Sequence, residues 1–208
     1  MQDERLQDPL AYERGFWSRG VSWIAGVDEA GRGPLAGPVV ACAVVLPPGT
    51  WIEGVRDSKL VAPAEREVLS RRILEAARAV ALGAASVREI DRYNILVATA
   101  LAMRRALARL EPVPEHVVVD GLPMKGLGWA HDAVVDGDAL VHSVACASIM
   151  AKVCRDRLMR RLAPRYPVYG WTTNVGYGTP EHLGAVSLHG TSPHHRLTFT
   201  GLQLDLGL

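Results

Sequence analysis

The chain has 208 residues, a formal net charge of +1, 49% apolar residues and 22% charged residues. These values are typical of a globular protein with one sizeable core, and they exclude a low-complexity chain. A near-neutral charge does not by itself indicate a nucleic-acid partner. No apolar stretch approaches the roughly 18 residues that span a bilayer, and the polar start, 1–5, is unlike a secretory signal. We therefore expect a cytoplasmic protein without a membrane contact.

The first half of the chain predicts strands followed by a helix and a further strand. A short leading helix is expected over 11–17, and valine-rich strands over 21–27 and 39–46 are bounded by glycine and proline. A helix begins at Pro63, because proline suits a first helical turn. Its apolar positions fall three and four apart at Leu69, Ile73, Ala76 and Val80. A strand over 83–87 follows.

The second half alternates and then becomes helical. A helix with an apolar face over 96–110 ends at Pro112, short strands follow over 117–119 and 133–135, and a long helix stops before Pro164. This order favours an α/β core of mixed sheet with a helical C-terminal section. There is no internal repeat and no flexible linker. The expected division is a helical lead over 1–20, a core over 21–163 and a C-terminal helical section over 164–208.

Acidic residues follow three of the predicted strands. Asp28, Asp120 and Asp138 each come after a valine-rich run, and Glu29 adjoins the first. Each aspartate alone is typical of a turn that ends a strand, but strand ends on one sheet edge bring such residues together. Close carboxylates repel one another, and Mg²⁺ prefers carboxylate oxygens, so a shared metal site is predicted. Neighbouring strand residues point to opposite faces, so both Asp28 and Glu29 face one metal only if the strand ends or kinks there.

A glycine-rich turn follows the acidic pair directly. Gly31 and Gly33 let backbone amides approach a ligand, and Arg32 between them can reach a phosphate. The alternative is a tight turn beside a solvated acidic pair. Carboxylates, close amides and an arginine together are the elements that phosphodiester chemistry requires.

Basic residues gather late in the chain. They are Lys152, Arg155, Arg157, Arg160, Arg161 and Arg165. Such a stripe can neutralise backbone phosphates, and Lys152 and Arg155, three apart on one helical face, are expected to hold a substrate backbone. The alternative is a solvated helix face.

Other chemistries find little support in the sequence. A zinc site at His189, His194 and His195 lacks a cysteine or paired acid to complete it, so loop histidines are the simpler interpretation. The three cysteines, Cys42, Cys146 and Cys154, lack metal or disulfide spacing and are interpreted as reduced, buried residues. No nucleophile elbow, zinc helix or Walker loop is present.

Taken in order, several segments resemble the motifs of the bacterial ribonuclease HII (type 2 ribonuclease H) family, over roughly 21–199. The first is Asp-Glu-Ala-Gly-Arg-Gly-Pro-Leu-Ala-Gly-Pro at 28–38. The others are Asp57-Ser58-Lys59, the Ile-Asp-Arg-Tyr-Asn-Ile run at 90–95, the strand at 117–121, Gly137-Asp138, the helix at 147–156, Gly176-Tyr177-Gly178-Thr179 and His195-Arg196. Many ordered segments are more specific than any single motif.

The resemblance implies a ribonuclease H-like fold, with a central five-stranded mixed sheet flanked by helices and a C-terminal helical subdomain. It implies an endonuclease, expected as a monomer, that cuts the RNA strand of RNA–DNA hybrids and nicks DNA 5′ to embedded ribonucleotides. The products would carry 3′-hydroxyl and 5′-phosphate ends, and two Mg²⁺ or Mn²⁺ ions would serve catalysis. The implied catalytic and metal-binding residues are Asp28, Glu29, Asp120 and Asp138. The implied substrate-binding residues are Gly31, Arg32, Gly33, Lys59, Asn94, Ser148, Lys152, Arg155 and Tyr177.

In this family the Gly-Arg-Gly backbone and a tyrosine read the ribose 2′-OH, which implies that role for 31–33 and Tyr177. From its residue type alone, Tyr177 is equally a core aromatic. The chain departs from the family pattern at Leu60, Ala139, Asn174, Val175 and Leu197, which concern substrate grip and leave all four acids present.

Two alternatives remain open from the sequence. One is a type 3 ribonuclease H, whose extra N-terminal domain about 20 leading residues cannot supply. The other is a catalytically silent hybrid-binding protein, and a magnesium-dependent cleavage assay separates it from an enzyme.

Overall fold

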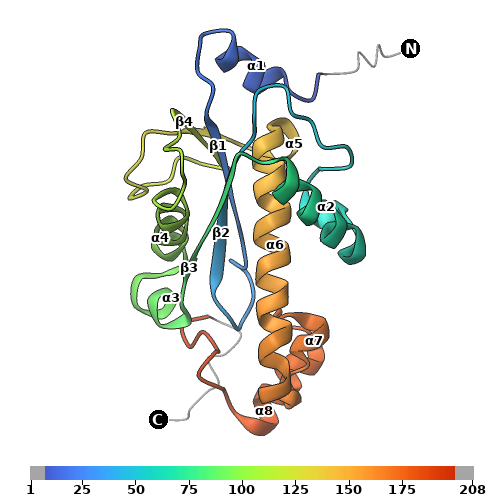
Figure 1. Ribbon diagram of the computed structural model, residues 1–208. Helices are drawn as coiled ribbons and strands as arrows, with labels where there is room; N and C mark the ends of the chain where they lie inside the picture. The colour runs from blue at the N-terminus through green and yellow to red at the C-terminus, as the bar shows by residue number, and fades with distance from the viewer. Residues whose placement is uncertain (1–7, 200–208) are drawn as a thin grey trace, which may run out of the picture.

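The computed structural model describes residues 8–199 and contains a five-stranded mixed sheet of order β3-β2-β1-β4-β5 (Figure 1). The strands are β1 (Ile24–Ala30), β2 (Val39–Val45), β3 (Ala79–Ala85), β4 (His116–Asp120) and β5 (Asp132–Val134). β1, β2 and β3 are antiparallel neighbours, whereas β4 pairs parallel with both β1 and β5. The expected five-stranded mixed sheet is confirmed.

Helices cover both faces of this sheet. They are α1 (Ala11–Trp17), α2 (Pro63–Ala76), α3 (Val87–Tyr93), α4 (Ile95–Leu107), α5 (Gly137–Leu140), α6 (His142–Leu162), α7 (Trp171–Asn174) and α8 (Pro180–His189). Figure 1 shows α4 on one side of the sheet, α2 and α6 on the other, and α7 and α8 at the C-terminal end of α6. The leading helix is confirmed. Val80, which the spacing assigned to the helix beginning at Pro63, lies instead in β3 opposite Val44, because the backbone becomes extended at Ala77.

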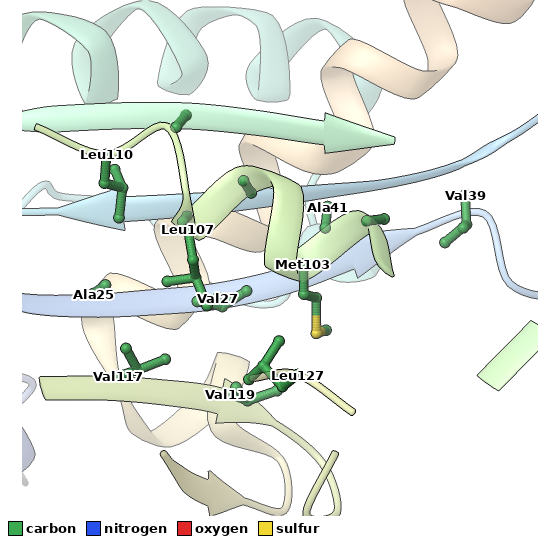
Figure 2. Packing of buried hydrophobic residues seen from close by; sticks show 14 of the residues in the cluster. Ala25, Val27, Val39, Ala41, Met103, Leu107, Leu110, Val117, Val119 and Leu127 are labelled. Carbon is green, nitrogen blue, oxygen red and sulfur yellow. The ribbon is translucent and has the colours of Figure 1, made fainter. Parts of the chain in front are cut away.

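The two faces of the sheet bury different residues of β1, as the period of two requires. Ala25 and Val27 pack with Met103 and Leu107 of α4 (Figure 2). On the opposite face, Gly26 lies against α6, where an added Cβ would stand 2.2 Å from the backbone carbon of Ser143. The missing side chain lets α6 run close along β1. This close packing sets where the side chains of α6 meet the end of the strand.

A third cluster joins the C-terminal section to the rest of the chain. It contains Leu35 and Ala36 from the loop after β1, Met159 from the end of α6, and Tyr169, Trp171, Val175 and Val186 from the following segments. The loop after β1 therefore packs against the end of α6 and the C-terminal segments that follow it. All three cysteines are free thiols, as the sequence indicated, and Cys42 and Cys146 are buried; Cys154 is only partly buried, so its expected burial is wrong. No helix in residues 8–199 has the length and apolar character to span a membrane.

Candidate active site

Three of the four predicted acids line one cleft at the ends of two neighbouring strands. Asp28 and Glu29 lie near the end of β1, and Asp120 is the last residue of the parallel strand β4. The pairing of β1 with β4 stops at Val27 and Val119, so β1 continues with β2 alone. The cleft at this step in the sheet has a volume of about 570 Å³.

Asp28 and Glu29 share this cleft although β1 remains regular. The expected strand end or kink is wrong, because β1 pairs with β2 in register through Ala30. Asp28 lies on the same face of the strand as Gly26 and points toward α6. Glu29 lies on the same face as Val27 and points toward α4. The cleft wraps around the free strand edge, with Ser148 and Lys152 of α6 and Ile95 of α4 among its lining residues. The acidic pair therefore reaches one cleft from two faces.

The fourth acid comes from a helical turn and not from the predicted strand end. Asp138 lies in the first turn of α5, which follows Asp136 in the left-handed conformation, φ 55°. The backbone N–H of Gly137 donates to Oδ1 of Asp120 at 2.8 Å and ties this turn to β4. Asp138 itself lines an adjoining cleft of about 650 Å³. Its carboxyl group thus lies near those of Asp57 and Asp120, outside the cleft that Asp28, Glu29 and Asp120 share.

Burial and mutual repulsion raise the pKa of these carboxyl groups. Burial, together with the charge of Glu29, raises the pKa of Asp28 well above its usual range, although Ser148 opposes the shift. Burial also raises the pKa of Glu29, although Arg32 at 3.3 Å lowers it. Burial and the carboxylates of Asp57 and Asp120 raise the pKa of Asp138 to about 6. The folded protein alone therefore disfavours the fully ionised state of these acids.

The donor set fits a hard divalent cation, because it consists of carboxylate oxygens that repel one another. In the described part of the chain, no three Asp, Glu, His or Cys side chains already stand close enough together to hold an ion. Binding by three or four of these acids therefore requires side-chain rotation.

The glycine-rich turn forms one wall of the cleft beside the predicted tyrosine. Gly31 has φ +96°, and a Cβ there would stand 2.0 Å from Nε of Arg155, so only glycine fits. At Gly33 an added Cβ would meet Tyr177 Cε1 at 4.0 Å, which is ordinary contact. Tyr177 lines the cleft with 42% of its surface exposed, so it is not a core aromatic.

Two lysines also line the cleft. Lys59 extends from the segment before α2 with 80% of its side chain exposed. Lys152 donates to Oδ1 of Asp156 at 2.8 Å, and its Nζ lies 5.5 Å from the centre of the Tyr177 ring. Ser148 is buried beside them and donates to the Oγ of Ser58 at 3.0 Å. The predicted residues 31–33, Lys59, Ser148, Lys152 and Tyr177 are thus brought together in one cleft.

The expected role of Arg155 in binding substrate requires correction. The side chain is fully buried, and its guanidinium donates to the backbone carbonyls of Ala36, Pro38 and Val175. A phosphate in the cleft cannot reach it in this arrangement. The basic stripe therefore divides: Lys152 faces the cleft, Arg155 faces the interior, and Arg161 lines a different surface with Arg109.

Asn94 lies outside the lining of the cleft and caps a helix. Its Oδ1 accepts from the N–H groups of Leu96 and Val97 at the start of α4, at 2.9 and 3.1 Å. Its backbone has a positive φ of 70°, a sign that asparagine tolerates better than most residues. The contact orients the helix that presents Ile95 to the cleft.

The suggested histidine group does not assemble. His189 is exposed, whereas His195 is buried against His182, with 3.0 Å between their Nε2 atoms. His182 also accepts from Nε1 of Trp171 and, through Nδ1, bonds to the backbone carbonyl of Tyr177 at 2.8 Å. The sequence reasoning missed His182 because it lies 13 residues from its partner and its burial has no local signal. Ser58 was missed likewise, although it lies within the Asp57-Ser58-Lys59 motif.

Comparison with known proteins agrees with this geometry. The family model described as Ribonuclease HII matches residues 25–201. A ribonuclease HII from Geobacillus thermodenitrificans is 46% identical, with 99% of this chain and 79% of that protein covered. A ribonuclease HII from a Synechococcus strain is 50% identical, with 97% and 92% covered.

Solved structures place the fold in the same group. The ribonuclease H2 of Pyrococcus horikoshii matches with a TM-score of 0.74 and 30% identity over 86% of this chain and 95% of that chain. A ribonuclease HIII crystallised with Mn²⁺ matches with a TM-score of 0.67 over 88% of this chain and 68% of that chain, and its 17% identity supports the fold alone. The chain belongs to the ribonuclease HII family and is a ribonuclease H enzyme.

Proposed function

We propose that this enzyme hydrolyses the RNA strand of RNA–DNA hybrids and also nicks a DNA duplex on the 5′ side of an embedded ribonucleotide. The products carry 3′-hydroxyl and 5′-phosphate ends. The observation that supports this most directly is the single cleft that joins an acidic group, a glycine-rich turn and an exposed tyrosine. A hydrolytic centre thus lies next to groups suited to contact one sugar.

The acids Asp28, Glu29, Asp120 and Asp138 would hold the divalent ions, either Mg²⁺ or Mn²⁺. When bound, two such ions supply an activated water and stabilise the leaving oxygen of a phosphodiester. The protein contributes the arrangement of the carboxylates: Gly137 N–H fixes Oδ1 of Asp120, and Glu29 N–H donates to Oδ1 of Asp28 at 2.6 Å. These backbone donors hold one oxygen of each carboxylate in place.

The rest of the cleft would hold the nucleic acid. Lys59 and Lys152 supply positive charge for phosphates, and the ring of Tyr177 offers a surface on which a sugar or base can pack. The backbone of 31–33 lies beside this ring and lines the same cleft. We propose that the enzyme acts as a monomer, and sedimentation at assay concentration tests that state.

The decisive experiment compares three duplexes of one sequence: all-DNA, DNA with a single ribonucleotide, and a full RNA–DNA hybrid. We expect Mg²⁺-dependent cleavage of the last two and none of the first, with no cleavage in a chelator. Mapping the ends should place the nick 5′ to the ribonucleotide, and a phosphatase-sensitive label should identify the 5′-phosphate. Cleavage of the hybrid without cleavage of the single-ribonucleotide duplex would reduce the proposal to hybrid hydrolysis alone.

A further inference from the structure

Arg196 is fully buried on the side of the glycine-rich turn that faces away from the cleft. Its guanidinium donates to the backbone carbonyls of Gly31, Arg32 and Gly37, at distances of 2.5 to 2.9 Å. In residues 8–199 no carboxylate forms a salt bridge with it. Burial, with the neighbouring charge of Arg155, lowers the pKa of Arg196 to about 9, so the side chain stays charged at neutral pH. Backbone carbonyls alone therefore satisfy this buried cation.

These contacts fix the direction of two peptide groups. A trans peptide is planar, and its carbonyl and its N–H point in opposite directions. The carbonyl of Gly31 belongs to the same peptide as the N–H of Arg32, and the carbonyl of Arg32 to that of Gly33. Because Arg196 draws both carbonyls toward the interior, both amide hydrogens point away from it.

That direction leads to the cleft. Gly31, Arg32 and Gly33 all line the cleft, whereas Arg196 does not. Within the described residues neither of the two amides donates to a protein acceptor. The turn follows Glu29 by only two residues, and Tyr177 stands next to Gly33. Two N–H groups thus face the place where the ribose adjoining the cut phosphate would lie.

We propose that Arg196 is the positioning residue for ribose recognition: it holds the Gly31 and Arg32 carbonyls so that the Arg32 and Gly33 amides receive the 2′-hydroxyl of the ribonucleotide. This inference rests on the proposed function and adds a residue that does not touch the substrate. A duplex without the hydroxyl leaves these amides unpaired, and a site built to bond a hydroxyl rejects the analogue that lacks it.

Arg155, a residue of α6, provides a control because it bonds to other carbonyls of the loop after β1. It is equally buried and also donates to three backbone carbonyls, but these belong to Ala36, Pro38 and Val175. None of them precedes Arg32 or Gly33. Replacing either arginine with lysine removes the forked guanidinium and keeps the charge, so the two variants differ chiefly in which peptides are released.

The test measures two quantities for each protein in one Mg²⁺ assay. The first is kcat/KM on a duplex with a single ribonucleotide, and the second is the inhibition constant of an all-DNA duplex of the same sequence used as a competitor. For Arg196→Lys we expect kcat/KM to fall about tenfold or more, as for the loss of one or two hydrogen bonds, while the inhibition constant changes less than twofold. For Arg155→Lys both quantities should change by a similar factor.

A proportional loss of both quantities in Arg196→Lys would assign this arginine to folding alone and overturn the inference. Failure of the parent enzyme to cut the single-ribonucleotide duplex would instead refute the proposed function. Where Arg196→Lys does not fold, backbone amide NMR of the parent protein tests whether the Arg32 and Gly33 amides contact the 2′-hydroxyl. The Arg32 and Gly33 signals should shift more with the single-ribonucleotide duplex than with the all-DNA duplex in the absence of divalent ions, and equal shifts would overturn the inference.

Discussion

The acidic cleft and the region behind the glycine-rich turn both bury polar side chains, but they satisfy them in opposite ways. The region behind the turn is defined by four buried residues, Arg155, Arg196, His182 and His195. In the cleft, Asp28 and Glu29 lie beside further carboxylates, and the half-exposed Arg32 is the cation in contact with Glu29. Behind the cleft, Arg155 and Arg196 are fully buried, and each donates to three backbone carbonyls. One region leaves its charge uncompensated, whereas the other distributes its charge over the backbone.

The difference separates a site that acts on a ligand from a scaffold that shapes it. Repelling carboxylates destabilise the protein alone and gain their compensation from a bound cation. Buried cations with satisfied donors hold a loop in one conformation. The two regions should therefore respond in opposite directions to substitution and to pH, and four experiments test this.

The largest effect is expected for Asp28→Asn. The amide keeps an oxygen for the N–H of Glu29 but removes a charge, so cleavage should fall by at least about a hundredfold, the scale for losing one preorganised electrostatic group. Because repulsion is relieved, the melting temperature in a chelator should rise. The matched control is the exposed Asp136→Asn, which should change neither value. Near-normal cleavage by Asp28→Asn would remove this residue from the metal site, and Asp120→Asn should lose activity similarly.

The second experiment uses pH, for which the two regions have opposite signs. Burial lowers the pKa of His195 to about 4, below the value of about 6.5 in the unfolded chain. Between pH 4 and pH 6.5 the unfolded state binds more protons at His195 than the folded state does. The stability that His195 contributes is therefore complete above pH 6.5 and is lost as the pH falls toward 4. The loss amounts to about 3 kcal/mol of unfolding free energy for this one group.

The carboxyl groups of the cleft act in the other direction. Their pKa values are raised on folding, so the folded state binds more protons and gains stability as the pH falls through the same range. Denaturant unfolding from pH 7 to 4 in parent and His195→Gln isolates the histidine, because the acids are common to both. The free energy of unfolding of His195→Gln should fall less steeply between pH 7 and pH 4 than that of the parent. The exposed His189→Gln is the control, and an identical slope in parent and His195→Gln would contradict the assignment.

The third experiment concerns the tyrosine that connects the two regions. The ring of Tyr177 lines the cleft, while its backbone carbonyl bonds to His182 in the region behind the turn. Removing a stacking surface worth about 1–3 kcal/mol should make Tyr177→Ala about five- to 150-fold slower on a single-ribonucleotide duplex, with a smaller loss on a full hybrid. Tyr177→Phe separates the hydroxyl from the ring. Tyr93→Ala, at a tyrosine of nearly equal exposure outside the cleft, should cut normally.

The smallest effect is expected from the basic residues of α6. Lys152→Gln should lower the slope of log affinity against log salt by about one, because one phosphate contact is lost, and should weaken binding to all sequences alike. Arg161→Gln, on the same helix but outside the cleft, should leave the slope unchanged. An unchanged slope for Lys152→Gln would show that this lysine contacts Asp156 but no phosphate of the nucleic acid.

Local pattern in the sequence predicted much of the fold and most of the cleft. Valine-rich runs separated by helical spacing predicted the mixed sheet, because side-chain periodicity is a property of neighbouring residues. The acids after those runs, and the glycine turn beside Asp28, were predicted for the same reason. The motifs shared with ribonuclease HII added Tyr177, Lys59 and Ser148, which the fold brings to the same cleft.

Tertiary structure alone decided what each charged side chain does. Lys152 and Arg155 are three residues apart and indistinguishable as cations in the sequence, yet one lines the cleft and the other is buried. Asp138 reaches the acids from a helical turn, and His182 meets His195 across 13 residues. Burial and hydrogen-bond partners depend on which distant segments supply carbonyls or carboxylates. The sequence by itself therefore determines where charge occurs, and only the packing of distant segments determines whether that charge is compensated inside the protein or left for a ligand.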